Sequence, residues 1–475
     1  MKAKRLMALT LAMVMTVTSL AGCSGNGAAS GAAPAASAAS TAGAGAAAPA
    51  KAEDLTIDAL KLGEDYKDIK ADLKVLTGKT DIVDTLLQDY TKEFQKLYPN
   101  INITYEGITN YEGELATRMT TKDWGDVCYL PASVSNKADF PTYFFPLGDQ
   151  KTLSEKYNWT DDKYYDGKSY GLACDGNVQG LVYNKRIWAE AGVTELPKTP
   201  DEFLADLKKI KDKFGDKVIP MYTNFSAQWP MTAWDSYTTS GATGDAEFFN
   251  IKLPHAKNPF SKPSDGSMTG PYAVYYTLYE ATSRKLIEKD PTTTDWESSK
   301  PRMNKGEIAT MALGTWAVSQ IQNAGANKDD IAYMPFPITV NGKQYANVSG
   351  DYNYAINVTS SNDNKIASMI YIKWMVEKSG YWKDMGTIST VKSDPLPGVL
   401  SAFKGAEMIS DKPPKAGEEA LLGKIGSDSE IGINADFSHV AKIVEAAETG
   451  KTSLDNLMAE WNKKWTAAQE KNGIK

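Results

Sequence analysis

The sequence predicts an α/β protein of two domains, in which short strands alternate with helices along most of the chain. The first observation is a strand, helix, strand unit near the start of the body. Residues 73–77 and 101–105 alternate between apolar and polar side chains, and apolar residues recur at helical spacing over residues 82–97. The second observation is size, because about 425 residues follow the N-terminal segments, which is enough for two domains.

The same alternation continues downstream. Brief apolar segments predict further strands at residues 126–130, 170–173, 180–183, 218–222, 331–335 and 354–358. Apolar spacing and flanking Pro or Gly residues predict helices at residues 111–120, 184–191, 200–214, 273–289, 315–322 and 367–378. Loops and helices follow Gly380 and end in an amphipathic helix over residues 454–469. Units of this kind favour a mainly parallel sheet flanked by helices in each domain, with a helical C-terminus.

Residues 1–22 are typical of a lipoprotein signal peptide. Three basic residues between positions 2 and 5 precede an apolar run over residues 6–20, which is too short to span a bilayer comfortably. The motif LAGC, which ends at Cys23, matches the bacterial lipobox, where a diacylglycerol is attached to the cysteine thiol. An ordinary signal peptide with an accidental cysteine and an uncleaved anchor helix are the alternatives. Each places the body outside the cytoplasm.

Residues 23–70 are expected to be the lipidated cysteine, a tether and a lead-in. Ala, Gly, Ser and Pro make up almost all of residues 24–50, a composition that cannot bury a core. Residues 51–70 are a polar lead-in. Ser24 follows Cys23 where two-membrane bacteria use Asp to retain lipoproteins at the inner membrane. We therefore expect a lipid-anchored protein on the outer face of a single-membrane cell.

The composition excludes several classes of function. The formal net charge is −7, so the basic surface that nucleic-acid binding requires is absent. Apart from Cys23, the chain has only Cys128 and Cys174, which are not at metal-binding spacing. These two cysteines could be a buried reduced pair or a disulfide. The two histidines, His255 and His439, leave little material for a zinc site or for histidine-based catalysis. No metal and no cofactor are expected.

Several segments together resemble the extracellular solute-binding proteins of ABC importers, in the cluster that includes maltose- and oligosaccharide-binding proteins. Their order and spacing carry the likeness, which covers nearly all of residues 71–475. The segments are FQKLYPNINITY (94–105), GDV (125–127), YNK (183–185), LPKTPDEF (196–203), GEIATM with GTW (306–316) and YAINVTS (354–360).

The resemblance implies a two-lobed, periplasmic-binding-protein-like fold with a multi-strand hinge. Lobe one would span residues 71–174 and 348–380, and lobe two residues 177–345 and 381–475. A carbohydrate, most simply a di- or oligosaccharide, would bind in the cleft between the lobes and pass to the ABC permease subunits and their cytoplasmic ATPase. A ligand that touches both lobes favours the closed state. We expect a monomer.

Sugars present hydroxyls around the ring and C–H patches on its faces, so a site for them needs aromatic plates together with carboxylates or amides. The chain has 11 Trp, 24 Tyr and 13 Phe. The family pattern places the candidate ligand-binding residues on lobe one (Lys79, Asp81, Glu112 and Tyr129), on the two crossings (Asp175, Asn177, Asp351 and Tyr352) and on lobe two (Trp316, Trp229, Trp234 and Phe437).

Each candidate also has a purely structural reading. Lys79 and Glu112 could be solvated surface charges, the residues on the crossings could serve only hinge hydrogen bonds, and any tryptophan could pack in a core.

Two other classes of function remain open. A lipid-anchored glycoside hydrolase would also need aromatic residues and a pair of carboxylates. The chain lacks a nucleophile elbow, a metal-binding helix motif and a phosphate loop, so we expect no enzyme. The same fold could instead carry a peptide, polyamine, iron or phosphate ligand, because a fold does not determine its cargo.

Overall fold

The structure is a computed structural model, and it describes residues 51–121, 124–131, 133–134, 136–434 and 437–474. The predicted signal peptide, Cys23 and the Ala/Gly-rich tether lie outside the described residues. Within the described ranges, no helix combines the length and the apolar character that crossing a membrane requires.

Alternating apolar residues build the first sheet, whose strand order is β2-β1-β3-β14-β4, with β8 also paired to β14. Strands β1, β2 and β3 are mutually parallel, whereas β14 runs antiparallel to its partners. The strands are β1 (Ala71–Thr77), β2 (Ile101–Gly107), β3 (Val127–Tyr129), β4 (Phe144–Phe145), β8 (Leu172–Ala173) and β14 (Asn353–Asn357). The predicted strand, helix, strand unit is therefore present.

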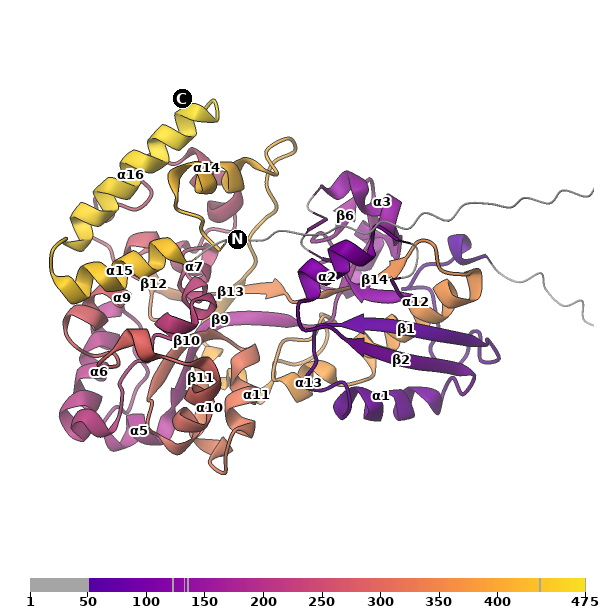
Figure 1. Ribbon diagram of the computed structural model, residues 1–475, viewed down its shortest axis with the longest axis horizontal. Helices are drawn as coiled ribbons and strands as arrows, with labels where there is room; N and C mark the ends of the chain where they lie inside the picture. Colours follow the sequence, from indigo (N-terminus) through magenta and orange to yellow (C-terminus); the bar gives the residue numbers. More distant parts are fainter. Residues whose placement is uncertain (1–50, 122–123, 132, 135, 435–436, 475) are drawn as a thin grey trace, which may run out of the picture. The chain divides into compact units, whose positions relative to one another are not determined.

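Helices cover this first sheet (Figure 1). The predicted helix over residues 82–97 begins only at Leu86, because the chain turns through residues 78–85 after β1. The helices of this part are α1 (Leu86–Gln95), α2 (Tyr111–Arg118), α3 (Phe140–Tyr143), α4 (Gln150–Lys156) and α12 (Asn362–Glu377). A small three-stranded sheet joins β5 (Gly148–Asp149), β6 (Tyr164–Tyr165) and β7 (Lys168–Ser169).

The lead-in that we predicted as polar contributes to the same core. Ala52, Ile57 and Leu60 are at most 5% exposed and pack with the apolar residues of the first sheet. Ile57 N–H also donates to the carbonyl of Leu147. Residues from Lys51 onward are therefore part of the folded body.

The second sheet has the order β10-β9-β13-β12, with β11 paired to β9 and β15 paired to β13. Its strands are β9 (Gly176–Asn184), β10 (Thr310–Gly314), β11 (Ile331–Pro335), β12 (Thr339–Val340), β13 (Lys343–Gly350) and β15 (Ala406–Ile409). Strand β9 pairs antiparallel with β10, β11 and β13. The two-lobed α/β class is confirmed, but the expected parallel pairing is here limited to β13 with β15 and to isolated bridges, because β9 and β13 carry the chain in opposite directions.

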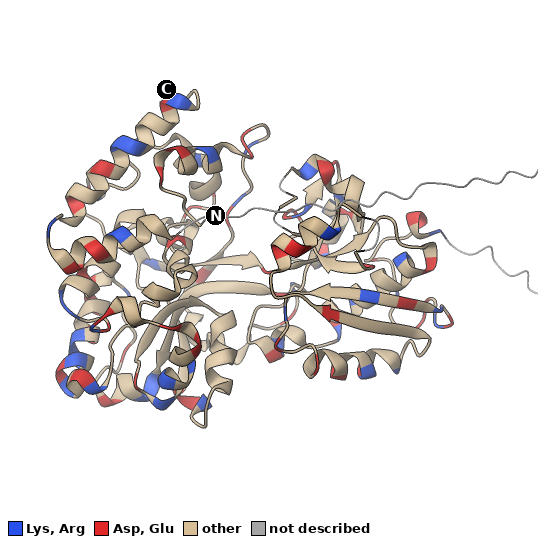
Figure 2. Ribbon diagram, viewed as in Figure 1, with Lys and Arg blue, Asp and Glu red and all other residues tan. Residues whose placement is uncertain are grey.

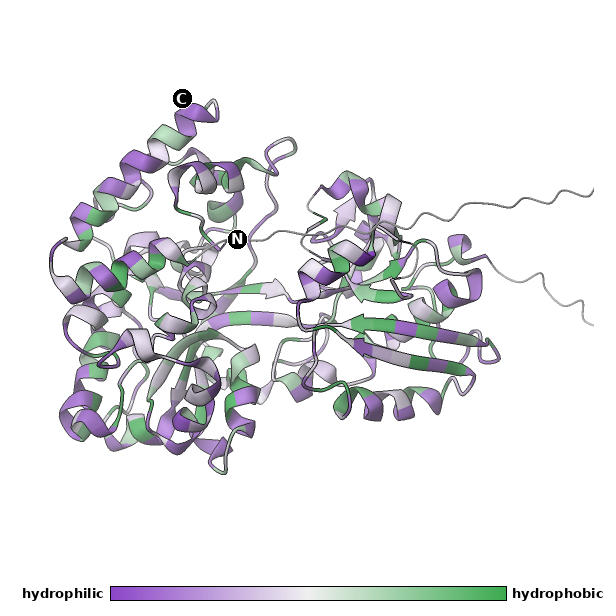
Figure 3. Ribbon diagram, in the orientation of Figure 1, coloured by the Kyte–Doolittle hydropathy of each residue, from purple (hydrophilic) through white to green (hydrophobic). Residues whose placement is uncertain are grey.

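Side-chain caps begin four of the helices around the second sheet: α5 (Lys185–Glu190), α6 (Pro200–Phe214), α10 (Trp296–Lys305) and α16 (Leu454–Lys471). Helix α6 begins with a capping box, in which Thr199 accepts from the N–H of Glu202 and the Glu202 side chain accepts from the N–H of Thr199. The other helices around this sheet are α7 (Ala233–Ser236), α8 (Ser240–Thr243), α9 (Gly270–Ser283), α11 (Trp316–Asn323), α14 (Leu421–Ser429) and α15 (Ser438–Thr449). Helix α13 (Tyr381–Met385) instead packs Tyr381 and Met385 against the core of the first sheet. Figure 3 shows the hydrophilic residues of the helices interleaved with apolar ones.

A two-stranded ribbon joins the two sheets. Strands β8 and β9 on one side pair with β14 and β13 on the other, and the antiparallel register is unchanged from Leu172 opposite Tyr354 to Val178 opposite Val348. A third segment runs beside it, where Gly176 and Ile388 exchange backbone hydrogen bonds of 2.8 Å. Charged residues are scarce along β9 and β13 (Figure 2). The multi-strand hinge that we predicted is therefore a continuous ladder.

Candidate functional site

A cavity of about 800 Å³ opens beside this ribbon. Both sheets contribute to it: the loop after β1 comes from the first, and helices α10 and α11 flank the second. Its wall includes Gly78, Lys79, Thr80, Asp81, Ile82, Asp175, Trp229, Glu297, Lys300, Trp316, Ser319, Gln320, Asn323, Ala324, Asp351, Tyr352, Met385 and Thr387.

Three tryptophans form an aromatic wall on the second-sheet side. The Trp229 and Trp316 rings lie 5.5 Å apart at 42°, and both meet Trp296 edge-on at 5.8 and 5.7 Å. Trp229 remains 48% exposed, whereas Trp296 is buried beneath it at 8%. The Lys300 ammonium sits 5.2 Å above the Trp296 ring. Trp229 and Trp316 are thus held by neighbouring rings with surface left to offer a ligand.

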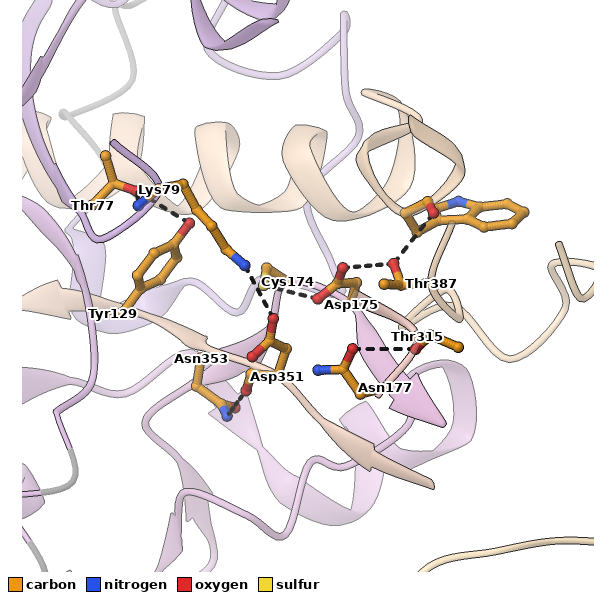
Figure 4. A network of polar contacts seen from close by, with 11 residues as sticks. Thr77, Lys79, Tyr129, Cys174, Asp175, Asn177, Thr315, Asp351, Asn353 and Thr387 are labelled. Atoms are coloured by element: carbon orange, nitrogen blue, oxygen red, sulfur yellow. Dashed lines mark hydrogen bonds and ion pairs between the residues drawn. The ribbon is translucent and has the colours of Figure 1, made fainter. Parts of the chain in front are cut away.

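A charged pair, Lys79 and Asp351, lines the cavity opposite the tryptophans. Figure 4 shows the Lys79 side chain pointing toward the Asp351 carboxylate. The Lys79 ammonium lies 3.3 Å from the Asp351 carboxylate and 5.2 Å above the Tyr352 ring. Tyr352 in turn stacks on Tyr129 at 4.7 Å. Burial alone would favour the neutral amine, but Asp351 and Asp175 outweigh it and raise the pKa of Lys79, so the ammonium stays charged.

Asp175 lies on the ribbon and is 1% exposed. Its carboxylate accepts the Thr387 hydroxyl at 2.6 Å and the Cys174 thiol at 3.2 Å. Burial and the nearby Asp351 raise its pKa. One atom each from Cys174, Asp175 and Asp351 lies within 4.8 Å of the others, so these groups could ligate a metal. The Lys79 ammonium already places a cation beside Asp351.

Seven of the predicted ligand-binding residues line the cavity: Lys79, Asp81, Asp175, Asp351, Tyr352, Trp229 and Trp316. Tyr129 lies directly behind Tyr352, and its hydroxyl accepts from Thr77 at 3.4 Å. Asn177 lies on β9, where its side-chain oxygen accepts the Thr315 hydroxyl at 3.3 Å.

The structure does not bring the other three to this wall. Trp234 is 1% exposed and packs edge-on against Tyr237 and Phe336, because α7 turns its ring into the core of the second sheet. Phe437 packs against that same core, just before α15. Glu112 lies in the first turn of α2, outside the residues that line the cavity.

Sequence reasoning missed the polar residues that flank the tryptophans. Glu297 and Lys300 form an ion pair of 2.7 Å on α10, and Lys300 also donates to Gln320 of α11 at 3.4 Å. A signal was present, since Gln320 lies one helical turn after Trp316 and so shares its face. Met385 and Thr387 lie close to Ile388 in the third segment beside the ribbon. No feature of the local sequence predicted that they would line the cavity.

Comparisons with known proteins identify a family and similar structures. The family model described as bacterial extracellular solute-binding protein matches residues 78–381. The structure is similar to a manno-oligosaccharide-specific solute-binding protein of Bifidobacterium animalis subsp. lactis in complex with mannotriose, with 44% identity, a TM-score of 0.80, and coverage of 89% of this chain and 100% of that one. A second binding protein of an ABC transporter from that organism, in complex with mannobiose, gives the same values.

Among curated proteins, the multiple sugar-binding protein of Streptococcus mutans is 22% identical over 65% of this chain and 72% of its own length. The family match extends over more than half of the chain, and the residues it covers include the ribbon and most of the cavity wall. The chain belongs to the bacterial extracellular solute-binding protein family.

Proposed function

We propose that the chain captures a neutral oligosaccharide in the cavity between its two sheets and delivers it to an ABC importer. The observation that carries the proposal is the pairing of two partly exposed tryptophan rings with charged and hydroxyl groups across one cavity. Rings stack on the C–H faces of sugars, and the polar groups bond their hydroxyls. The similarity to manno-oligosaccharide-binding proteins makes β-linked or α-linked mannose oligomers the first ligands to test.

The charges that line the cavity disfavour an acidic ligand. Four carboxylates, from Asp81, Asp175, Glu297 and Asp351, outnumber the two ammonium groups of Lys79 and Lys300. An acidic sugar would add a further negative charge to this surface, at a cost that water only partly screens. The volume of the cavity lies within the usual range for small-molecule pockets.

Isothermal titration calorimetry with mannobiose and mannotriose tests the proposal, with maltotriose and an oligouronate as comparison ligands. We expect saturable binding of a neutral oligosaccharide and none of the oligouronate. Trp229→Ala should weaken binding, whereas Trp234→Phe, a matched change in the core, should preserve it. Tight binding of the oligouronate, or of a peptide or polyamine in a thermal-shift screen, would refute the proposal.

The proposal includes that the ligand is released intact. Both oxygens of Asp175 are engaged by Thr387 and Cys174, and Asp351 is paired with Lys79, so neither carboxylate is placed as a free nucleophile. Chromatography of mannotriose after prolonged incubation with the protein should recover only mannotriose. The appearance of mannose or mannobiose would establish a hydrolase instead.

We also propose that the body is held at the outer face of the cell membrane by lipid on Cys23 and works there as a monomer. The LAGC motif and the Ala/Gly-rich segment that follows it support this. Cells fed labelled palmitate should label the protein, and Cys23→Ser should abolish the label and release the protein to the medium. Retention of the unlabelled variant at the membrane would contradict the lipid anchor.

A further inference from the structure

Two of the three tryptophans in the aromatic wall stand at the ends of loops that begin side by side. One loop leaves the strand-like segment 219–222 at Thr223 and reaches Trp229, and the other leaves residue 288 and reaches Trp296. Met221 N–H donates to the Leu286 carbonyl at 3.1 Å, so the two segments run parallel up to this point. Both loops therefore share one base.

The Glu288 carboxylate closes that base. One of its oxygens accepts the Thr223 N–H at 2.9 Å, and the other accepts the Thr223 hydroxyl. That hydroxyl in turn accepts the Phe225 N–H at 3.2 Å, which starts the first turn of the Trp229 loop. Glu288 is 5% exposed, so its carboxyl group is shielded from water and accepts its hydrogen bonds from the neighbouring loop instead.

The loop that Glu288 holds is a strained one. Asn224 and Gln228 adopt positive φ angles of 58° and 65°, which residues other than glycine rarely adopt. Such conformations persist only where surrounding contacts determine them. The second loop supplies two further ties, from Ser226 N–H to the Thr294 hydroxyl at 2.6 Å and from Asp295 N–H to the Tyr222 hydroxyl at 2.9 Å.

We propose that Glu288 is a positioning residue for ligand binding: its carboxyl group fixes the base of both loops and thereby holds Trp229 over Trp296 in the aromatic wall. It touches no ligand itself. The inference rests on the proposed function, but the arrangement of the rings can be measured without any sugar.

Two substitutions separate the role of the carboxyl group from general stability. In Glu288→Ala the Thr223 N–H loses its acceptor inside the protein, whereas in Glu288→Gln the amide oxygen can still accept it. Asn462→Ala is the matched control, because Asn462 is also buried and its oxygen accepts the Phe260 N–H at 3.1 Å, away from the cavity wall.

The first readout needs no ligand. We first compare the near-ultraviolet circular dichroism spectra of the wild type and of Trp229→Phe. The part of the spectrum that this substitution removes is the signal of the coupled tryptophan rings. We expect Glu288→Ala to lose most of that signal, Glu288→Gln to retain it, and Asn462→Ala to leave it unchanged. An unaltered ring signal in a folded Glu288→Ala protein would overturn the proposal.

The second readout is calorimetric affinity for whichever neutral oligosaccharide the wild type binds. We expect Glu288→Ala to bind about tenfold more weakly, as one lost buried hydrogen bond allows, with near-complete rescue in Glu288→Gln. An equal loss of affinity in Asn462→Ala would show a general effect of destabilisation and overturn the proposal. If the wild type binds no sugar but the ring signals behave as expected, only the proposed function fails.

Discussion

Glu288 also predicts how the stability of the protein depends on pH. Burial raises the pKa of this carboxyl group from its ordinary value of 4.5 to about 7, although the hydrogen bonds from Thr223 favour its charged form. Replacing it by glutamine removes the titrating group but keeps an acceptor for the Thr223 N–H. The comparison of wild type with Glu288→Gln therefore isolates the titration of one buried residue.

The sign and size of the effect follow from linkage. Between pH 4.5 and pH 7 the folded chain keeps a proton on Glu288 that the unfolded chain has lost, so the free energy of unfolding falls as the pH rises through this window. Each pKa unit corresponds to about 1.4 kcal/mol. The wild type should therefore lose about 3 kcal/mol more than Glu288→Gln between pH 4.5 and pH 8.

Urea unfolding followed by tryptophan fluorescence at pH 5, 6, 7 and 8 measures this difference directly. Other titrating groups contribute equally to both proteins, so only the gap between the two curves matters. The gap between the two free energies of unfolding should change steadily between pH 5 and pH 7 and flatten toward pH 8. Parallel curves over the whole range would refute the account of Glu288 as a buried, largely protonated group at acidic pH.

Three further predictions concern the ribbon and the cavity. A Cβ at Gly176 would lie 1.9 Å from the Trp159 ring, so Gly176→Ala should destabilise the protein by about 1 to 3 kcal/mol in a denaturation curve, and Trp159→Leu should relieve part of that loss. An equal loss with and without Trp159→Leu would contradict the clash. Trp229→Ala should weaken oligosaccharide binding about tenfold or more in calorimetry while leaving Tm nearly unchanged, since this ring is half exposed, and a large fall in Tm would indicate a packing role instead. Lys79→Met leaves Asp351 without its ammonium partner and should cost about 1 to 3 kcal/mol at pH 8. The Lys79→Met cost should be smaller at pH 5, where protonation of Asp175, whose pKa burial and Asp351 raise to about 6, relieves its repulsion with Asp351; a cost independent of pH would argue against this repulsion.

Local patterns sufficed for the elements whose side chains alternate cleanly. Strands β1 and β2 and the helix between them follow from apolar spacing. The GTW segment predicted Trp316 as a ligand-binding residue, and this ring lines the cavity. The likeness to solute-binding proteins added the two-lobed architecture, which the fold and the family match confirm.

Contacts between residues far apart in the chain determine the features that local sequence patterns did not predict. Trp229 and Trp234 lie close together in the sequence, but a 3-10 turn over residues 229–232 leaves the first ring exposed at the cavity, whereas α7 turns the second into the core. Glu288 follows two apolar residues and resembles any surface acid until its pairing with Thr223, sixty-five residues away, is known. The uninterrupted register of the hinge ribbon likewise depends on strands far apart in the chain.

We expect the cavity between the two sheets to hold a neutral oligosaccharide. Calorimetric titration of the purified protein with mannotriose tests it most directly, alongside Trp229→Ala and Trp234→Phe. Saturable binding of one sugar per chain is expected, weakened by Trp229→Ala and preserved by Trp234→Phe. The absence of binding to mannotriose and to every other neutral oligosaccharide by a correctly folded protein would contradict it.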